Sequence, residues 1–324
     1  MSEKILEVKN LRIKYAVEKT YAEAVNGIDF DLKKGEILGL VGETGAGKTT
    51  TALSIMGLLP RFVSNAEGEI LYRGENILAM SEKRLRRLRG KEISMIFQDP
   101  MTSLNPVFTV GYQIADVIRI HNPKMSHSEI NEKVDEMMEM VGIPAERKSE
   151  YPHQFSGGMK QRIVIAIALA CNPEILIADE PTTALDVTIQ AQVMMMMKEL
   201  QKKQNSAVIL ITHDLGLVAS FCDKIAVMYA GEIVEAGTVF DIFDKEKCHH
   251  PYTEGLFGSI PDITIKTDRL KPIPGLTPHP TDLPKGCKFH PRCSKCITCC
   301  ETDAPPTSAN GTHLVRCHVV KEEA

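Results

Sequence analysis

Residues 37–49 read ILGLVGETGAGKT, an apolar run followed by a glycine-rich loop that ends in Lys48 and Thr49. The residues after the loop, TTTALSIMGLL at positions 49–59, look helical, so the order is strand, loop, helix. This order and the spacing G-x-x-x-x-G-K-S/T are typical of a phosphate-binding loop. Glycines let backbone N–H groups close around phosphate oxygens, and the helix N-terminus adds positive potential. A plain glycine-rich turn before a helix is the alternative. The predicted nucleotide contacts are Gly42, Glu43, Thr44, Gly45, Ala46, Gly47, Lys48, Thr49 and Thr50.

A second apolar run, residues 175–178, ends in the adjacent carboxylates of Asp179 and Glu180. A phosphate-binding loop works with an acid on a neighbouring strand, which orients Mg²⁺ directly or through water. We expect Asp179 to take that role beside Thr49, and Glu180 to accept a proton from an attacking water. Two acids after a strand are commonly just exposed charges, so this signal gains its weight from the loop.

A third motif reads QFSGGMKQR over residues 154–162, directly before an apolar helix. Ser156 is suited to cap that helix, and Gly157 and Gly158 leave its first N–H groups unobstructed. The segment is therefore a second candidate anion site, although an ordinary capped helix would have the same sequence.

Composition restricts the class of protein. The chain has 324 residues, enough for about two domains. With 43% hydrophobic and 25% charged residues it is neither disordered, collagenous nor a coiled coil. Its net charge of -4 lacks the basic excess that would favour nucleic acid as a partner. The longest apolar run, residues 163–171, is far short of the roughly 20 residues that cross a bilayer, and the N-terminus lacks a signal-peptide core. We expect a cytoplasmic protein that acts at a membrane only through partners.

The pattern of apolar runs predicts an α/β fold. Runs at 37–41, 93–97, 175–178, 208–211 and 225–229 show almost no polar alternation, which is typical of strands buried on both faces of a mainly parallel sheet. Helical patterns lie between them, at 48–58, 128–140, 157–170 and 189–203. Residues 243–291 contain eight prolines, so we place a domain boundary near Phe243 and predict domains over 1–242 and 243–324.

The loop, the Ser-Gly-Gly segment, the acidic strand end, the Ala-Leu-Asp of residues 184–186 and His213 together resemble an ABC-type ATPase. The resemblance implies a P-loop NTPase fold of the ABC type, with a RecA-like core sheet, an antiparallel β subdomain and a helical signature subdomain at about 99–170. It also implies ATP as substrate and Mg²⁺ as cofactor.

Further positions are carried over from this resemblance one at a time. Gln98 matches the glutamine that contacts Mg²⁺ and the attacking water, and His213 matches the histidine that touches the γ-phosphate. Asp186 matches the D-loop, and Tyr15 stands where an aromatic ring stacks on adenine. Taken alone, each of these residues could instead be an ordinary surface, loop or edge-strand residue without a role in nucleotide binding. The implied catalytic set is Lys48, Gln98, Glu180 and His213.

The resemblance further implies a head-to-tail sandwich, in which the phosphate-binding loop of one subunit and the Ser156 segment of another hold the same ATP. One departure is Met159, where many family members have Gln. Because the anion contacts come from Ser156 and the glycine N–H groups, we expect this change to alter subunit recognition and not to abolish activity.

Within the family, the chain is similar to the D-type ATP-binding subunit of dipeptide/oligopeptide importers. The motifs are FQDPMTSLNP, SGGMKQR and a tail with HHPYTEGL, IPG, GCKFHPRC and HLVRCH. The implied partners are an F-type ATPase in a heterodimer, two permeases and an extracytoplasmic solute-binding protein, at the inner face of the membrane and without nucleic acid. Nickel or another small solute is an alternative cargo. A soluble ABC ATPase of DNA repair or translation is a further alternative, although such proteins tend to carry two cassettes or long coiled coils.

The tail holds six of the nine cysteines within its last 38 residues. Cys287, Cys293, Cys300 and Cys317 form a C-x5-C-x6-C-x16-C pattern that matches the tail of the family, with Cys296 and Cys299 between them. In a reducing compartment, clustered thiols favour a metal site over disulfides.

We expect a 4Fe-4S cluster in preference to zinc, since thiolates select iron–sulfur and the spacing is not that of a typical zinc knuckle. Zinc and free thiols remain alternatives. The candidate substitute ligands are His290, His313 and His318. The nearby cations that could offset the negative charge of a cluster are Lys285, Lys288, Arg292, Lys295 and Arg316.

Overall fold

The computed structural model describes residues 3–60, 64–98, 100–183, 185–259 and 272–320. Its contacts divide the chain into two compact units. The first comprises Met1–Ile5, Leu32–Ile37 and Ala79–Ile211, and the second comprises Leu6–Asp31, Leu38–Leu78 and Thr212–Ala324. Within the described ranges, none of the helices has both the length and the apolar character needed to span a membrane.

Three parallel strands form the sheet of the first unit: β6 (Ile93–Ile96), β7 (Ile175–Asp179) and β8 (Ala207–Thr212). Ile93 pairs with Ile175, and Ile175 pairs with Ala207. Every residue of these strands is buried, as the absence of polar alternation predicts. The sheet therefore presents the end of β7, where Asp179 lies, as its candidate chemical edge.

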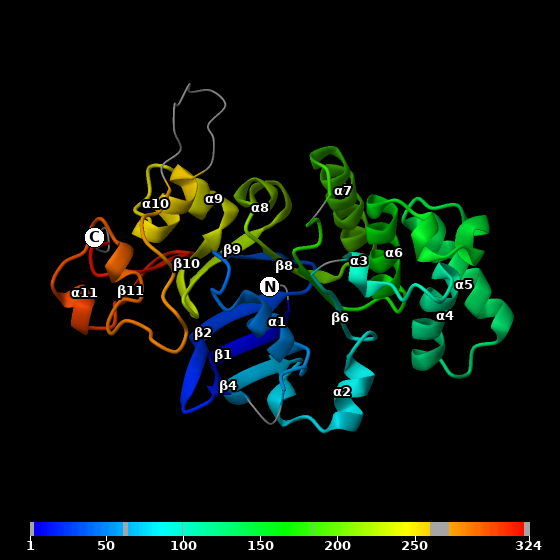
Figure 1. Ribbon diagram of the computed structural model, residues 1–324, viewed down its shortest axis with the longest axis horizontal. Coiled ribbons are helices and arrows are strands. Elements are labelled where there is room, and N and C mark those ends of the chain that lie inside the picture. Colours follow the sequence, from blue (N-terminus) through cyan, green and yellow to red (C-terminus); the bar gives the residue numbers. More distant parts are fainter. Residues whose placement is uncertain (1–2, 61–63, 99, 184, 260–271, 321–324) are drawn as a thin grey trace. The chain divides into compact units, whose positions relative to one another are not determined.

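Helices make up most of the first unit (Figure 1). They are α2 (Glu82–Leu88), α3 (Pro100–Ser103), α4 (Val110–His121), α5 (His127–Met140), α6 (Gly157–Leu169) and α7 (Val187–Gln204), with 3-10 turns at Ala145–Ser149 and Pro152–Gln154. Hydroxyl side chains cap four of them: Ser81 caps α2, Thr109 caps α4, Ser126 and Glu129 form a capping box on α5, and Ser156 caps α6. The α4 helix, absent from the sequence-based assignment, buries Val110, Ile114 and Ile118 and packs with α5 and α6.

A small antiparallel sheet lies in the second unit, in the strand order β2-β1-β4-β5. The strands are β1 (Lys4–Val17), β2 (Thr20–Lys33), β4 (Ser64–Tyr72) and β5 (Glu75–Asn76), followed by a 3-10 turn at Ile77–Ala79. Polar and apolar residues alternate in much of β1, so one face is buried while the other carries exposed charges. No apolar run marks these strands in the sequence.

A second group of hydrogen-bonded strands in the same unit has the order β3-β9-β10-β12-β11. Its strands are β3 (Ile37–Val41), β9 (Lys224–Tyr229), β10 (Glu232–Thr238), β12 (His313–Arg316) and β11 (Thr307–Asn310). Only β3 and β9 pair in parallel, and the pairs beyond β9 are antiparallel. Pairing of Glu235 with Val315 joins the C-terminal segment to β10.

Short helices accompany this sheet. They are α1 (Lys48–Ile55), α8 (Leu215–Phe221), α9 (Val239–Phe243), α10 (Pro251–Gly258) and α11 (Cys299–Thr302), with a 3-10 turn η4 at His290–Arg292. The β3–loop–α1 order is the one predicted for the phosphate-binding loop. Residues 260–271 of the proline-rich segment lie outside the described residues.

Candidate functional site

Two glycines in the loop between β3 and α1 lie where a side chain would clash with the backbone of neighbouring segments. Gly47 has φ +100°, and a Cβ there would lie 2.4 Å from the carbonyl oxygen of Ala24. At Gly42 a Cβ would lie 2.2 Å from the carbonyl oxygen of Met228. Gly45, at φ +83°, faces open space instead. The loop is thus packed tightly at both ends and open at its centre, as a cradle for phosphate groups requires.

Lys48 begins α1 and reaches back across this loop. Its Nζ donates to the carbonyl oxygens of Gly42 at 2.7 Å and Glu43 at 2.9 Å. The helix has no side-chain cap and no acidic residue in its first turn. The positive end of the helix and the ammonium group therefore lie at the same loop, which suits an anionic ligand. Thr44 and Thr49 are exposed beside them.

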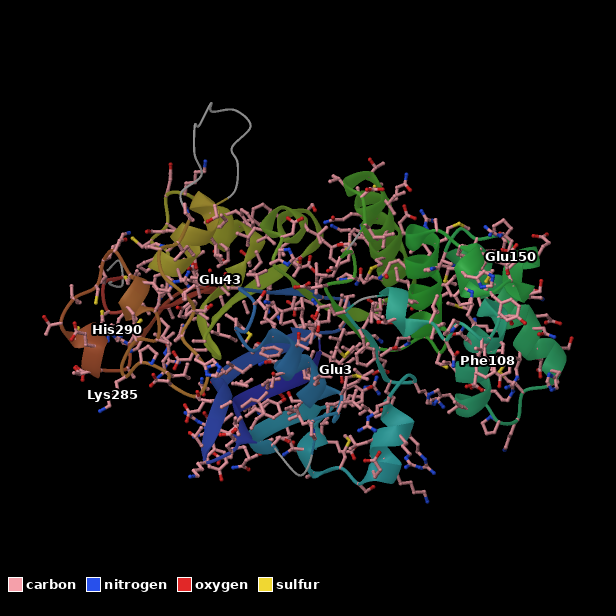
Figure 2. The ribbon with its side chains drawn as sticks, viewed as in Figure 1. Glu3, Glu43, Phe108, Glu150, Lys285 and His290 are labelled. Atoms are coloured by element: carbon pink, nitrogen blue, oxygen red, sulfur yellow. The ribbon has the colours of Figure 1, made fainter. Side chains whose placement is uncertain are left out.

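Glu43, which is labelled in Figure 2, contacts two residues of the C-terminal segment, residues 243–324. Its backbone N–H donates to the hydroxyl oxygen of Tyr252 at 2.8 Å. Its carboxylate accepts two hydrogen bonds from Arg292, at 2.6 and 3.1 Å. Both groups of Glu43 are thus engaged by residues more than 200 positions later in the chain.

In the first unit, Glu180 follows β7 and meets the predicted glutamine. Gln98 donates from Nε2 to Oε2 of Glu180 at 2.9 Å, and the Thr183 hydroxyl donates to the same oxygen at 3.1 Å. Glu180 has φ +47°, a left-handed conformation that is costly for a residue with a side chain. Its N–H donates to Ile211 of β8, which holds this backbone in place. Asp179, one residue earlier, is buried.

Ser156 caps α6 as predicted, and its hydroxyl accepts from the N–H of Met159 at 3.4 Å. A Cβ at Gly158 would lie 2.6 Å from Cγ2 of Ile189, at the start of α7. At Gly157 the nearest atom would be 3.9 Å away, so this position is open. The two glycines therefore differ, since Gly158 permits helix packing and Gly157 leaves a helix N-terminus accessible.

The remaining predicted positions occur at element ends. Asp186 precedes α7, where its carbonyl accepts from the N–H of Gln190, and Ala184 lies outside the described residues. His213 is exposed in the segment between β8 and α8. Tyr15 is half-buried on β1 and pairs with Ser64 of β4.

The nine cysteines are all free thiols. Cys287, Cys300 and Cys317 are buried, Cys293 is half-buried, and the N–H of Cys287 donates to the carbonyl of Cys300 at 2.9 Å. Burial is the main cause that raises the pKa of Cys287 to about 11, and the neighbouring thiols Cys300, Cys317 and Cys293 contribute to the same shift. Four predicted ligands are thus brought into one neighbourhood, whereas Cys296 is exposed.

Other tail residues take different partners from those expected. Arg292, Lys295 and Arg316 pair with Glu43, Glu254 and Glu232, so carboxylates already offset their charge. The ring nitrogens of two proposed substitute ligands contact backbone carbonyls, His290 that of Cys287 and His318 that of Asp303.

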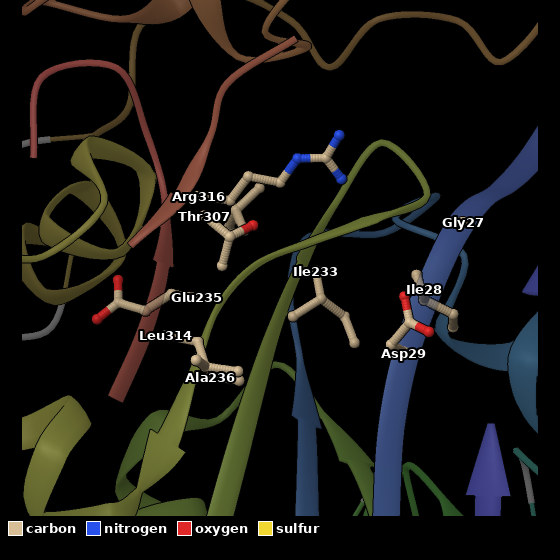
Figure 3. A pocket seen from close by; sticks show the side chains of 10 residues that line it. Gly27, Ile28, Asp29, Ile233, Glu235, Ala236, Thr307, Leu314 and Arg316 are labelled. Atoms are coloured by element: carbon tan, nitrogen blue, oxygen red, sulfur yellow. The ribbon is translucent and has the colours of Figure 1, made fainter. Parts of the chain in front are cut away.

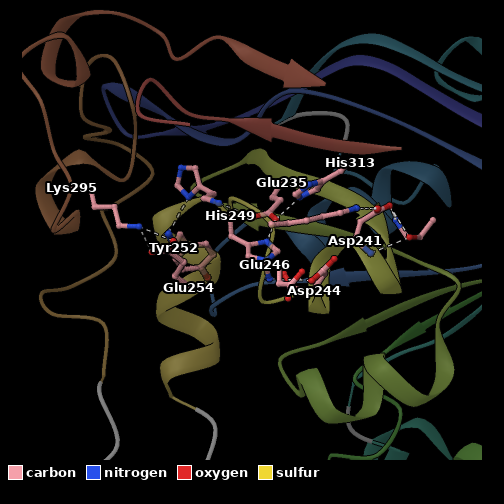
Figure 4. Close-up of polar contacts among 12 residues, drawn as sticks. Glu235, Asp241, Asp244, Glu246, His249, Tyr252, Glu254, Lys295 and His313 are labelled. Atoms are coloured by element: carbon pink, nitrogen blue, oxygen red, sulfur yellow. Dashed lines mark hydrogen bonds and ion pairs between the residues drawn. The ribbon is translucent and has the colours of Figure 1, made fainter. Parts of the chain in front are cut away.

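Glu235 organises a buried cluster in which Nδ1 of His249 lies 2.6 Å and Nε2 of His313 2.8 Å from its Oε1 (Figure 4). Among the described residues, the ligand atoms of these three lie within 4.8 Å of one another. A metal bonded to them at about 2 Å would hold them further apart, so the distances fit charge-assisted hydrogen bonds. Although burial opposes it, these bonds lower the pKa of Glu235 to about 2.

Figure 3 shows a pocket of about 200 Å³ in the second unit. Its lining comes from β2, β10, β11 and β12, with charged groups at Asp29, Glu235 and Arg316. None of its lining residues belongs to the predicted nucleotide site.

Sequence reasoning missed the roles of Tyr252 and Thr183 and the cluster around Glu235, and it assigned Arg292 to the cysteines instead of to Glu43. His249, Tyr252 and Arg292 lie within the tail motifs HHPYTEGL and GCKFHPRC. The sequence therefore marked these residues as part of a motif but did not indicate what they contact. Nothing local links them to Glu43 or Glu235, because those contacts span up to 249 residues.

Comparison with known proteins gives this architecture a family. Residues 25–183 match the family described as ABC transporter, and residues 234–300 match the oligopeptide/dipeptide transporter C-terminal region. The dipeptide transport ATP-binding protein DppD of Bacillus subtilis is 48% identical over 99% of this chain and 96% of its own. The protein of the same name from Lactococcus lactis is 50% identical over 97% of this chain and 90% of its own.

Solved structures agree with this. The ATP-binding cassette MJ0796, in a dimeric post-hydrolysis state with ADP and Pi, superimposes with a TM-score of 0.65 at 27% identity, over 72% of this chain and 98% of its own. The cbiO1 protein of Clostridium perfringens gives a TM-score of 0.65 at 29% identity, over 75% of this chain and 92% of its own. The predicted P-loop fold of the ABC type is confirmed, and the chain belongs to the ATP-binding proteins of the ABC transporter family.

Proposed function

We propose that this chain is an ATP-hydrolysing subunit of an ABC importer that takes up di- and oligopeptides through partner permeases. The observation that carries the ATPase part is the loop between β3 and α1, closed at Gly42 and Gly47 and crossed by Lys48. The peptide part is supported by the C-terminal region match over residues 234–300 and by relatives named as dipeptide transport proteins.

The nucleotide roles follow the chemistry of each side chain. Lys48 and the loop N–H groups bind phosphate oxygens, and Tyr15 stacks on the adenine. Thr49, Asp179 and Gln98 supply the oxygen ligands that Mg²⁺ prefers. When bound, Mg²⁺ neutralises charge on the phosphates.

Hydrolysis needs a base that is held in place. Gln98 and Thr183 both donate to one carboxylate oxygen of Glu180, which fixes the orientation of the carboxylate. Glu180 then accepts the proton of the attacking water, and His213 stabilises charge at the terminal phosphate.

The second half of the site comes from another subunit. The open N-terminus of α6, with Ser156, Gly157 and Gly158, suits a phosphate presented by a partner. Asp186 would face that partner at the subunit boundary. We propose an F-type ATPase as the partner, two permeases above the pair, an extracytoplasmic solute-binding protein, and a peripheral position on the inner face of the membrane.

We further propose that residues 1–242 form the ATPase domain, with its helical subdomain at about 99–170, and that residues 243–324 form the C-terminal domain. Three buried thiols and one half-buried thiol support a metal centre at Cys287, Cys293, Cys300 and Cys317, since the charges of the other three act on the thiol of Cys287. Such soft donors suit a 4Fe-4S cluster, with Zn²⁺ as the alternative. Iron, acid-labile sulfide and zinc analysis after anaerobic purification tests it: four irons and four sulfides per chain are expected, and one zinc without iron would exclude the cluster.

The function is tested with Glu180→Gln. The variant should bind ATP as tightly as the parent and hydrolyse it about 10²–10⁴-fold more slowly. In cells, uptake of a labelled dipeptide should stop. Unchanged turnover would remove Glu180 from its role. Recovery of nucleic acid or ribosomes instead of permeases from solubilised membranes would refute the importer.

A further inference from the structure

Tyr252 and Arg292 contact the phosphate-binding loop, although they belong to the C-terminal segment. We propose that both are positioning residues for nucleotide binding: they fix Glu43 and neutralise its charge, so that the loop is preorganised for ATP. This inference rests on the proposed ATPase function. The role assigned to both residues is indirect, because each contacts Glu43 of the loop.

Arg292 is oriented by several contacts at once. Its side chain is only 5% exposed, and Nε donates to the carbonyl of Pro274 at 2.9 Å while the other nitrogens donate to Glu43. Its guanidinium lies 5.7 Å from the ring centre of Tyr229 and 6.0 Å from that of Phe289. A planar fork held in this way makes a geometrically specific pair with a carboxylate, which a flexible lysine would not reproduce.

Tyr252 fixes the backbone of the same residue. The side chain is fully buried, with ring centres 4.7 Å from Tyr229 and 5.4 Å from Phe289. Burial raises the pKa of its hydroxyl, which stays protonated and accepts the N–H of Glu43. One aromatic cluster therefore supports both the tyrosine and the arginine.

The need for this arrangement is electrostatic. Glu43 places a carboxylate in the loop whose task is to attract a polyphosphate, and an unpaired carboxylate there would repel it. Arg292 removes that repulsion without offering its own charge to the nucleotide, because two nitrogens are directed at Glu43. Loss of Arg292 should thus expose the carboxylate as well as loosen the loop.

A simpler role, in which the pair only anchors the C-terminal segment, makes a different prediction. An anchor lost by Arg292→Ala stays lost when Glu43 is also changed. If the unpaired charge causes the defect, then Glu43→Gln added to Arg292→Ala should restore part of the ATP affinity. Truncating one partner of a charge pair costs mainly through the charge left behind.

The experiment measures the dissociation constant of MgATP by calorimetry on the full chain, with thermal unfolding as a check of folding. Arg292→Ala should weaken binding about tenfold, or roughly 1.4 kcal/mol. Arg292→Ala with Glu43→Gln should recover to within about threefold of the parent. The matched control is Lys295→Ala, which breaks the exposed Lys295–Glu254 pair of the same segment and should leave binding unchanged.

Two milder variants apply if Arg292→Ala does not fold. Tyr252→Phe keeps the ring and removes the acceptor, and Arg292→Lys keeps the charge and removes the fork; each should weaken binding about threefold. Parent-like affinity in both variants would overturn the inference, as would a double variant no better than Arg292→Ala. Failure of the parent chain itself to bind ATP would instead refute the proposed function.

Discussion

Two glycine-containing segments of this chain are candidate phosphate binders, and they use glycine for different reasons. In the loop of residues 42–47, Cβ atoms would meet the backbone carbonyls of Met228 and Ala24 at 2.2 and 2.4 Å. At the start of α6, a Cβ on Gly158 would meet a side-chain methyl of Ile189, and Gly157 has nothing closer than 3.9 Å.

The difference concerns what can move. Backbone carbonyls are fixed by the sheet and its loops, whereas a methyl group at the end of a side chain can yield or be removed. The loop also depends on a distant residue, because Glu43 is hydrogen-bonded to Tyr252. By contrast, Ser156 caps its helix by accepting a hydrogen bond from the N–H of Met159, only three positions away. We therefore expect the loop to be intolerant of change and the helix start to be adaptable.

Gly47→Ala should have the largest effect. The residue would need φ +100° and would collide with the carbonyl of Ala24, so the free energy of unfolding should fall by about 3 kcal/mol. ATP binding should be lost as well, and calorimetry with chemical denaturation measures both. Gly45→Ala is the control, since its φ is also positive but its Cβ would meet nothing within 4 Å. Equal losses in the two variants would show that backbone strain, and not collision, is what matters.

A pH-dependent contact supports the segment that reaches the loop. The hydrogen bond to Glu235 raises the pKa of His249, so its contribution is complete below the ordinary value of about 6.5 and is lost as pH rises through the raised value. Glu235, with its pKa lowered to about 2, contributes above about 4.5 and loses this as pH falls towards 2. The pair should thus stabilise the fold most between about pH 4.5 and 6.5.

His250 opposes this stabilisation at acidic pH. Burial lowers the pKa of its imidazole to about 4, so as pH falls the unfolded chain takes up a proton before the folded chain does. The groups facing His249 also include Asp244, Glu254 and His313. The difference in the free energy of unfolding between the parent and His249→Gln cancels most of the contributions of these other groups. The variant should be less stable by about 1–2 kcal/mol near pH 5.5, and by less at pH 9. A difference independent of pH would mean that the contact is not an ion pair.

Gly158→Ala should cost about 1 kcal/mol, because the clash with Ile189 outweighs the gain of alanine in a helix. Ile189→Ala removes the obstructing Cγ2 atom. The double variant should therefore lose less stability than the sum of the single variants, as chemical denaturation of all four chains would reveal. Strict additivity would place the constraint in the backbone, as in the loop.

Sequence alone predicted the parts of the fold that depend on near neighbours. The strands at 37–41, 93–97 and 225–229 lie within one residue of β3, β6 and β9, because fully buried strands leave uninterrupted apolar runs. Strands β1 and β2 carry exposed charges on one face and left no such signal. The five predicted runs are the strands β3, β6, β7, β8 and β9, whose pairings β3–β9, β6–β7 and β7–β8 are parallel as expected, and the antiparallel strands beyond β9 were not predicted.

The site shows the same division. The loop and the cap at Ser156 follow from local spacing, whereas Gln98 was assigned to the site only through resemblance and its contact with Glu180 was not predicted. Arg292 was assigned to the cysteine cluster since its neighbour is Cys293, whereas its side chain pairs with Glu43. Sequence neighbours say little about where a long side chain ends when the fold brings a distant carboxylate within reach.

Gly157→Ala should have the smallest effect on stability and, unlike the other glycine substitutions, should stabilise the fold. Gly157→Ala places a methyl group where only Leu185 comes near, at 3.9 Å, and alanine restricts the unfolded chain more than glycine does. The free energy of unfolding should rise by about 0.5 kcal/mol. In an assembled transporter the same methyl would stand at the open helix N-terminus, where a partner's phosphate would approach, so the ATPase rate should fall. A variant that is more stable and less active would separate the two demands on this glycine, while unchanged ATPase activity would mean that no phosphate approaches Gly157.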